Sequence, residues 1–159
     1  VNGGTGGVGS IVVQLARQAG ATVIGLASAE NSAWPEGRGV IPVVYGDGWA
    51  ARVHEVAGKA DAFIDAFGGD YIDVAIDELG VDPSRVDTIV RFDAVAARGI
   101  KAEGSAAGQS AETLGTLAGL IAKGELEIPI AATYPLSAVR DAYAKLASGH
   151  IRGKIVLIP

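Results

Sequence analysis

The sequence predicts an α/β fold in which helices cover both faces of a doubly wound parallel sheet, the arrangement called the Rossmann fold. Two observations carry this prediction. A glycine-rich stretch, GGTGGVG, stands directly before a helical pattern, and short apolar runs then alternate with helical spacing along the chain. The chain has 159 residues, of which 49% are hydrophobic, so it is long enough to form one domain with a sizeable core.

The elements of the first half follow in order from the apolar pattern. Apolar residues at three- and four-residue spacing predict a helix from Val8 to Ala19, which ends at Gly20. Continuous apolar runs, typical of strands covered on both faces, alternate with further helical stretches. The predicted strands are Ala21–Ala27, Val40–Tyr45 and Ala60–Phe67, and the predicted helices are Trp49–Ala57 and Tyr71–Leu79.

The alternation continues into the second half and changes near its end. We expect strands at Val86–Phe92 and Gly99–Gly104 and a helix at Ala111–Lys123. The next apolar run, Glu127–Leu136, contains two prolines, which a central strand would not tolerate. The remaining predicted elements are a helix, Ser137–Ala147, and a terminal strand, Lys154–Pro159.

The glycine-rich stretch matches the pattern G-x-G-x-x-G at Gly4, Gly6 and Gly9. In this pattern the first glycine makes a tight turn, the second lets the backbone approach a pyrophosphate, and the third lets helix and strand pack closely. The free N–H groups and the dipole of the following helix then stabilise the diphosphate. A triphosphate-binding loop needs a lysine before Ser10, and none is present, so the sequence favours a dinucleotide.

The strand that should precede this loop is reduced to Val1 and Asn2. In a doubly wound sheet that strand is central, and strands usually run about 5 to 6 residues. The chain contains no methionine, so Val1 is not an initiator. We therefore expect a truncated first strand and a sequence that is part of a longer chain.

The identity of the dinucleotide depends on Ser28. About 20 residues past the loop, an NAD-binding domain usually places Asp or Glu to bind the ribose 2′-hydroxyl. Ser28 stands there instead, and a hydroxyl can donate to a 2′-phosphate, so NADP(H) is favoured over NAD. Glu30, two residues later, weakens this preference because its carboxylate could reach the ribose.

Composition excludes several other classes. The net charge is −5 and the basic residues are scattered, which predicts no nucleic-acid partner. No apolar stretch approaches the roughly 18 residues of a membrane span, and no signal peptide opens the chain. The absence of cysteine excludes disulfides and thiolate metal sites. We expect a cytoplasmic protein that holds no metal and contacts no membrane.

Five stretches together resemble the cofactor-binding half of zinc-independent, quinone-oxidoreductase-like members of the medium-chain dehydrogenase/reductase superfamily. These stretches are GGTGGVG, VVQLARQAGATVIGLAS, YGDG, FIDAFGG and GHIRGKIVLIP. The resemblance implies hydride transfer from NADPH to a small-molecule substrate, a quinone or an α,β-unsaturated carbonyl, with the protein orienting both partners. It implies an NADP-binding domain over residues 1–124 and a segment, 125–159, that would rejoin an absent N-terminal catalytic domain. The chain alone is then expected to be inactive.

The resemblance also places cofactor contacts on this sequence, although it assigns no catalytic residue. Such proteins often carry Lys or Arg just after the second strand, where this chain has Glu30 and Asn31, so Lys154 or Arg152 is expected to supply the cation. Val90 and Arg91 would approach the nicotinamide together with Phe92. The implied contacts are Gly4, Thr5, Gly6, Gly7, Val8 and Gly9 for the pyrophosphate, Ser28, Asn31, Tyr45 and Lys154 for the 2′-phosphate, Phe67 and Gly68 for the adenosine, and Phe92 for the nicotinamide.

Other interpretations stay open or fail on the sequence. A short-chain dehydrogenase needs Tyr-x-x-x-Lys, and none of the four tyrosines has a lysine four residues later. A non-enzymatic module that senses NADP(H) and reports to a partner remains an alternative. The resemblance further implies a homodimer paired through the Gly99–Gly104 strand.

Several titratable residues have simpler explanations than chemistry. Asp61 and Asp65 share a strand face, which a polar strand end explains better than acid catalysis. His54 is expected on the surface and His150 in a turn. Two interpretations of Arg91 stay open: a contact in the cofactor site and an ordinary salt bridge.

Overall fold

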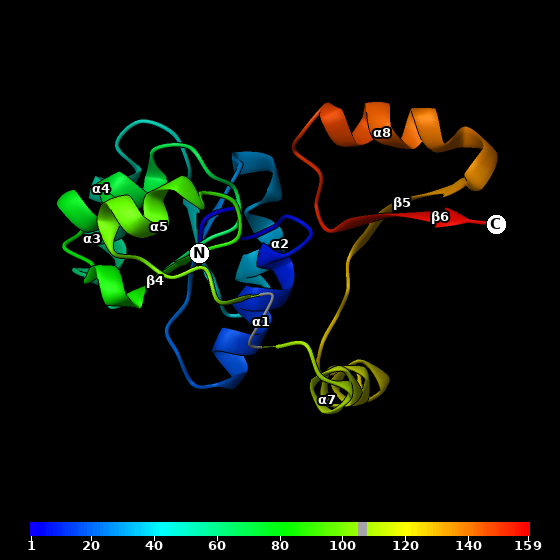
Figure 1. The fold of residues 1–159 in the computed structure, drawn as a ribbon, viewed down its shortest axis with the longest axis horizontal. Helices are drawn as coiled ribbons and strands as arrows, with labels where there is room; N and C mark the ends of the chain where they lie inside the picture. The colour runs from blue at the N-terminus through cyan, green and yellow to red at the C-terminus, as the bar shows by residue number, and fades with distance from the viewer. Residues whose placement is uncertain (105–107) are drawn as a thin grey trace.

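The computed structural model describes residues 1–104 and 108–159 and has the predicted α/β fold (Figure 1). Short parallel strands lie between two layers of helices. The last third of the chain extends from this body as a separate arm (Figure 1). Among the described residues, no helix combines the length and the apolar character that crossing a bilayer requires.

Two strand pairs flank the first two residues of the chain. β1 (Ile24–Ala27) pairs in parallel with β2 (Ile41–Val44), and β3 (Phe63–Asp65) pairs in parallel with β4 (Val86–Thr88).

The first two residues join these pairs. The Leu26 N–H donates to the Val1 carbonyl at 2.9 Å on one side, and the Asn2 N–H donates to the Ile64 carbonyl at 2.8 Å on the other. The spatial order is therefore β2, β1, residues 1–2, β3 and β4. This order is that of a doubly wound sheet with its central strand reduced to a single parallel bridge between Asn2 and Asp65.

The strands are shorter than the apolar runs that predicted them. Tyr45, Phe67 and Phe92 were predicted as the last strand residues, but all three lie beyond the ladders and are exposed. The predicted strand Gly99–Gly104 is wrong in extent, because Lys101 alone bridges to Asp87. Gly99 has a φ of 69° and closes the preceding helix, so the chain meets the sheet edge for one residue only.

Helices cover the two faces of the strands in two groups (Figure 1). α1 (Gly9–Gln18) and α2 (Ala33–Glu36) cover one face, and a cluster around Val13 and Trp34 is buried there. The other face carries α3 (Trp49–Ala57), α4 (Tyr71–Asp77) and α5 (Asp93–Arg98), packed over a larger cluster that includes Trp49. The apolar pattern did not predict α2, which contains a proline and is only four residues long.

The C-terminal arm is built on its own small sheet. α7 (Ala111–Ala122) leads to β5 (Ile130–Pro135), which pairs in parallel with β6 (Lys154–Ile158), and α8 (Val139–Ala147) connects the two strands. Both strands of a two-stranded sheet have a free edge, so a proline at the end of β5 is tolerated. Short 3₁₀ turns occur at Ala29–Asn31, Pro83–Arg85 and Leu136–Ala138.

Candidate functional site

The glycine-rich loop runs from the end of the first strand into α1 and folds through close backbone contacts. The Gly4 N–H donates to the Leu26 carbonyl at 3.0 Å, and the Gly6 N–H donates to the Gly3 carbonyl at 2.9 Å. A Cβ on Gly9 would lie 2.1 Å from the Gly3 oxygen, and a Cβ on Gly4 would lie 3.0 Å from the Gly25 Cα. The loop is therefore a bare backbone turn that side chains at Gly4 and Gly9 would obstruct.

This turn presents unpaired backbone donors. Within the described ranges, the N–H groups of Gly7, Val8 and Gly9 meet no hydrogen-bond acceptor. They stand at the first turn of α1, where the helix dipole places roughly half a positive charge. Such a helix N-terminus is suited to bind a phosphate or diphosphate.

The C-terminal arm contributes a cation to the same turn. The Gly153 N–H donates to the Thr5 carbonyl at 2.9 Å, which holds the start of β6 against the loop. The Lys154 Nζ lies 3.7 Å from the position that a Cβ on Gly7 would occupy. The structure thus brings Lys154 to the predicted pyrophosphate contacts rather than to Ser28.

Arg152, the other expected cation, lies elsewhere. Burial and the neighbouring positive charge of Arg152 lower the pKa of the Arg38 guanidinium, which itself covers the Trp34 ring and pairs with Glu127. Arg152 therefore lies near enough to Arg38, just past α2, for the two positive charges to interact.

The residues expected at a 2′-phosphate gather at the ends of β1 and β2. The Ser28 Oγ, directly after β1, is buried and has no hydrogen-bond partner among the described residues. The Asn31 Nδ2 donates to the His150 carbonyl at 3.4 Å, and the Tyr45 hydroxyl lies 2.9 Å from His150 Nδ1. The sequence placed His150 in a turn and missed this contact, because no spacing rule relates residues 45 and 150.

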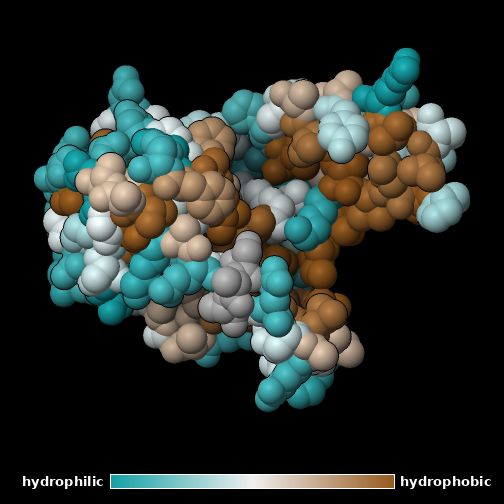
Figure 2. Space-filling model, in the orientation of Figure 1, coloured by the Kyte–Doolittle hydropathy of each residue, from teal (hydrophilic) through white to brown (hydrophobic). Residues whose placement is uncertain are grey.

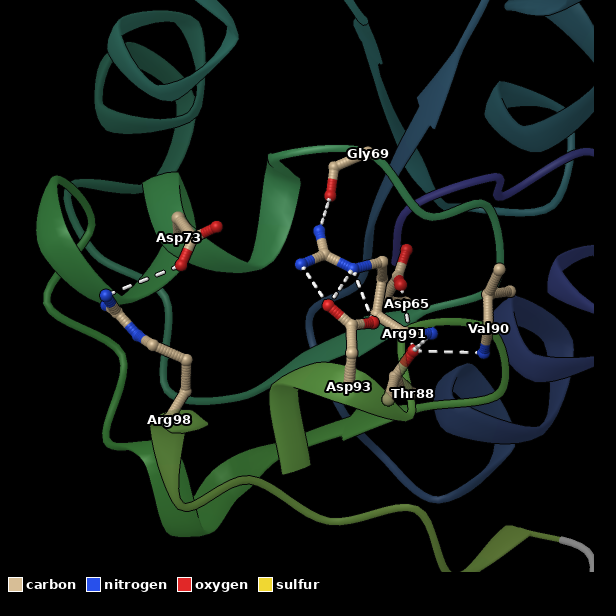
Figure 3. A network of polar contacts seen from close by, with 8 residues as sticks. All are labelled: Asp65, Gly69, Asp73, Thr88, Val90, Arg91, Asp93 and Arg98. Carbon is tan, nitrogen blue, oxygen red and sulfur yellow. Dashed lines mark hydrogen bonds and ion pairs between the residues drawn. The ribbon is translucent and has the colours of Figure 1, made fainter. Parts of the chain in front are cut away.

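The carboxyl ends of β3 and β4 are tied together by Asp65, which is completely buried (Figure 3). Its Oδ1 accepts from Asn2 Nδ2 at 2.8 Å and from the Gly68 N–H at 2.9 Å. Its Oδ2 accepts from the Thr88 hydroxyl at 2.9 Å. The Thr88 Oγ1 in turn accepts from the N–H groups of Val90 and Arg91. Asp65 therefore shapes the edge of the sheet, as expected for a polar strand end.

Arg91 is an ion-pair residue in this structure (Figure 3). Its Nε donates to Asp93 Oδ1 at 2.9 Å, its Nη1 donates to the Gly69 carbonyl, and the guanidinium lowers the pKa of the Asp93 carboxyl. Phe67 and Phe92 lie at the same edge with 67% and 64% of their surfaces exposed. Gly68 has a φ of 96°, and a Cβ on it would lie 3.2 Å from the Val90 side chain. The residues predicted to contact the adenosine and those predicted to contact the nicotinamide are therefore neighbours.

A glycine turn with free amides, at the carboxyl edge of parallel strands and at a helix N-terminus, defines a Rossmann-type nucleotide-binding fold. A family model described as zinc-binding dehydrogenase matches residues 43–157, and the chain belongs to that family. The expected resemblance to quinone-oxidoreductase-like medium-chain dehydrogenases is thereby confirmed.

Individual relatives agree with this assignment. The chain is 28% identical, over its whole length, to a chloroplast envelope quinone oxidoreductase homologue of Arabidopsis thaliana, of which it covers 51%. It is 27% identical to the quinone oxidoreductase from Coxiella burnetii, with a TM-score of 0.81 over 98% of this chain and 50% of the other.

More distant structures share the fold. A mycobacterial protein complexed with NADPH is 22% identical, with a TM-score of 0.75 over 99% of this chain and 55% of the other. An NAD-dependent alcohol dehydrogenase is 21% identical, with a TM-score of 0.76 over 98% of this chain and 49% of the other. The chain spans about half the length of the proteins it matches.

The residues of this chain do not fit the zinc ion in the name of the family. The chain has no cysteine and two histidines. His54 contacts the Gly58 carbonyl at 2.7 Å and His150 contacts Tyr45, and the described residues include no cluster of three metal-ligating side chains.

Proposed function

We propose that this chain is the nucleotide-binding part of an oxidoreductase and that it binds NADP(H) across the glycine turn. The observation that carries the proposal is the close backbone packing at Gly9 and Gly4, which leaves no room for a side chain, next to three unpaired N–H groups and Lys154. Bound NADPH would supply a hydride, and the turn and Lys154 would hold its diphosphate. The edge around Phe67, Gly68 and Phe92 would then face the rest of the dinucleotide.

The preference for NADP(H) over NAD rests on the chain's own residues. The distant relatives include one complexed with NADPH and one named as NAD-dependent, so the fold leaves both cofactors open. The buried Ser28 hydroxyl lacks a partner, and a phosphate oxygen would satisfy it. A carboxylate at that position would instead repel a phosphate.

The acceptor of the hydride is proposed to be a quinone or an α,β-unsaturated carbonyl. The names of the Arabidopsis and Coxiella relatives, quinone oxidoreductases of about twice this length, support that class. A second domain is needed to enclose the nicotinamide, and the arm offers a surface for one. No residue of α7 is buried, and Leu114 is 69% exposed.

The same surface continues over β5 and β6. Ile130 and Ile158 are exposed there, and Figure 2 shows apolar surface gathered along this part of the molecule. A contiguous exposed apolar surface marks an interaction site. These residues support a C-terminal segment, 125–159, that packs against a further domain of the whole protein.

Calorimetric titration of the chain with NADPH and with NADH tests this proposal. We expect both dinucleotides to bind and NADPH to bind about tenfold more tightly, because the 2′-phosphate adds charge-assisted hydrogen bonds. Equal dissociation constants would contradict the NADP(H) preference. Absence of binding by either dinucleotide would contradict the function itself.

A further inference from the structure

His150 occupies an unusual backbone position on the loop that joins α8 to β6. Its φ is 56°, and it is the one non-glycine residue with a positive φ among residues 1–104 and 108–159. Its neighbour Gly149, at a φ of 72°, shows that the loop turns through left-handed conformations that suit glycine. Strain of this kind in a non-glycine residue collects at ligand sites, where the side chain has a task that glycine cannot perform.

Contacts from two distant segments hold His150 in place. The planes of its ring and of the Tyr45 ring differ by 13°, with centroids 6.4 Å apart, and Nδ1 lies 2.9 Å from the Tyr45 hydroxyl. The Asn31 Nδ2 donates to the His150 carbonyl at 3.4 Å. The loop is thereby positioned against the ends of β1 and β2, the region that also contains the unpartnered Ser28 hydroxyl.

The orientation of the ring leaves one nitrogen for a ligand. When Nδ1 accepts the Tyr45 hydroxyl proton, the ring proton is on Nε2, and in the charged imidazolium both nitrogens donate. Within the described part of the chain, His150 Nε2 makes no hydrogen bond to a protein group, and the residue is exposed. A donor that carries a positive charge in the protonated ring is therefore available for an anion.

Two other basic side chains near this edge, Arg52 and Lys154, lie against other groups. Arg52 donates to the Val44 carbonyl at 2.8 Å and to the Asp47 carbonyl at 3.0 Å. Its guanidinium is therefore bound to the backbone at the end of β2 and in the turn that follows. The Lys154 Nζ lies 3.7 Å from the position of a Cβ on Gly7, and the charge of Arg152 is near enough to Arg38 to lower the pKa of that guanidinium. The charged groups nearest in sequence to Ser28 and Tyr45 are the acids Glu30 and Asp47, so an anion bound here needs a basic partner.

We propose that His150, oriented by Tyr45, binds the 2′-phosphate of NADP(H) and sets the preference of this chain for NADP(H) over NAD(H). The proposal rests on the proposed function, because it assigns a ligand of the same dinucleotide. In this proposal His150 takes the place of the Lys or Arg that relatives often carry after the second strand, where this chain has Glu30 and Asn31.

The test is calorimetric titration of the chain and of His150→Gly with NADPH and NADH. Glycine removes the imidazole and suits a φ of 56°, so this variant keeps the loop and the fold. We expect NADPH to bind about tenfold more weakly and NADH to bind unchanged, since one charge-assisted hydrogen bond to the phosphate is lost. His54→Ala is the matched control, because His54 contacts backbone carbonyls of Gly58 and Glu78, and this variant should bind both dinucleotides as the wild type does.

Each other outcome has a distinct meaning. Equal weakening of NADPH and NADH binding by His150→Gly would overturn the proposal, because a residue that only shapes the loop affects both. Unchanged NADPH binding would overturn it as well while leaving the proposed function intact. A wild-type chain that binds neither dinucleotide would instead remove the proposed function.

A second readout does not depend on any variant. The chain has two histidines, so its proton NMR spectrum contains two imidazole Cε1–H resonances, which His54→Ala assigns. NADPH should shift the His150 resonance and leave that of His54 in place, whereas NADH should shift neither. A His150 resonance that responds equally to both dinucleotides would contradict contact with the 2′-phosphate.

Discussion

Gly9→Ala is expected to abolish dinucleotide binding and to destabilise the chain by about 3 kcal/mol. The added Cβ would stand 2.1 Å from the Gly3 oxygen, 2.7 Å from the Gly3 carbonyl carbon and 3.0 Å from the Gly4 Cα. All three atoms are backbone, so no side-chain rotation can relieve the overlap. The loop must move away from the N-terminus of α1, which separates the free N–H groups from one another.

Urea unfolding and NADPH calorimetry measure the two effects of this substitution. Gly115→Ala is the matched control, because Gly115 is also helical and a Cβ there would meet nothing within 4 Å. Alanine is favoured over glycine in a helix by up to about 1 kcal/mol, so the control should be slightly stabilised and should bind NADPH normally. A Gly9→Ala chain that matches this control would show that the loop does not need its close backbone approach.

Asp65→Ala is expected to cost about 4 kcal/mol of stability, because it removes the acceptor that joins three segments of the sheet edge. The side chain is 0% exposed and accepts from Asn2, Thr88 and the backbone of the loop after β3. Water cannot easily replace it at that depth, so each donor would be left unsatisfied. Asn2 would lose the side-chain contact that fixes the first residues of the chain between β1 and β3.

Thermal unfolding of Asp65→Ala and Asp61→Ala distinguishes this role from a general effect of removing an acid. Asp61 lies just before the same strand, and its pKa is lowered by a hydrogen bond from Lys59, but the pair is exposed. Exposed pairs contribute little, so Asp61→Ala should unfold at nearly the wild-type temperature. Similar losses in both variants would contradict a specific buried network at Asp65.

Local patterns predicted the parts of the fold that local forces determine. The helix at Trp49–Ala57 occurs with the predicted bounds, because its apolar spacing and flanking glycines specify both face and ends. The glycine pattern predicted the turn before α1, since Gly9 is required by its backbone distances to Gly3 and Gly4, all within the first nine residues.

Patterns failed where tertiary packing decides the structure. Apolar residues such as Phe67 and Phe92 lengthened the predicted strands, yet they lie exposed at the carboxyl edge. The predicted strand around Lys101 is reduced to one bridge, to Asp87. Gly99 closes α5 only two residues earlier, so the path of the chain to the sheet edge depends on where that helix packs. His150 reaches Tyr45 only because the return from α8 to β6 closes on the first sheet, a contact over 105 residues that no periodicity encodes.

The central claim is that the bare turn before α1 grips a diphosphate through its backbone amides. Amide chemical-shift mapping by NMR during titration with NADPH tests it directly, since each glycine of the turn has its own resonance. The largest changes should fall on the unpaired amides of Gly7, Val8 and Gly9. Changes confined to other parts of the chain, with these three amides unmoved at saturating NADPH, would contradict the claim.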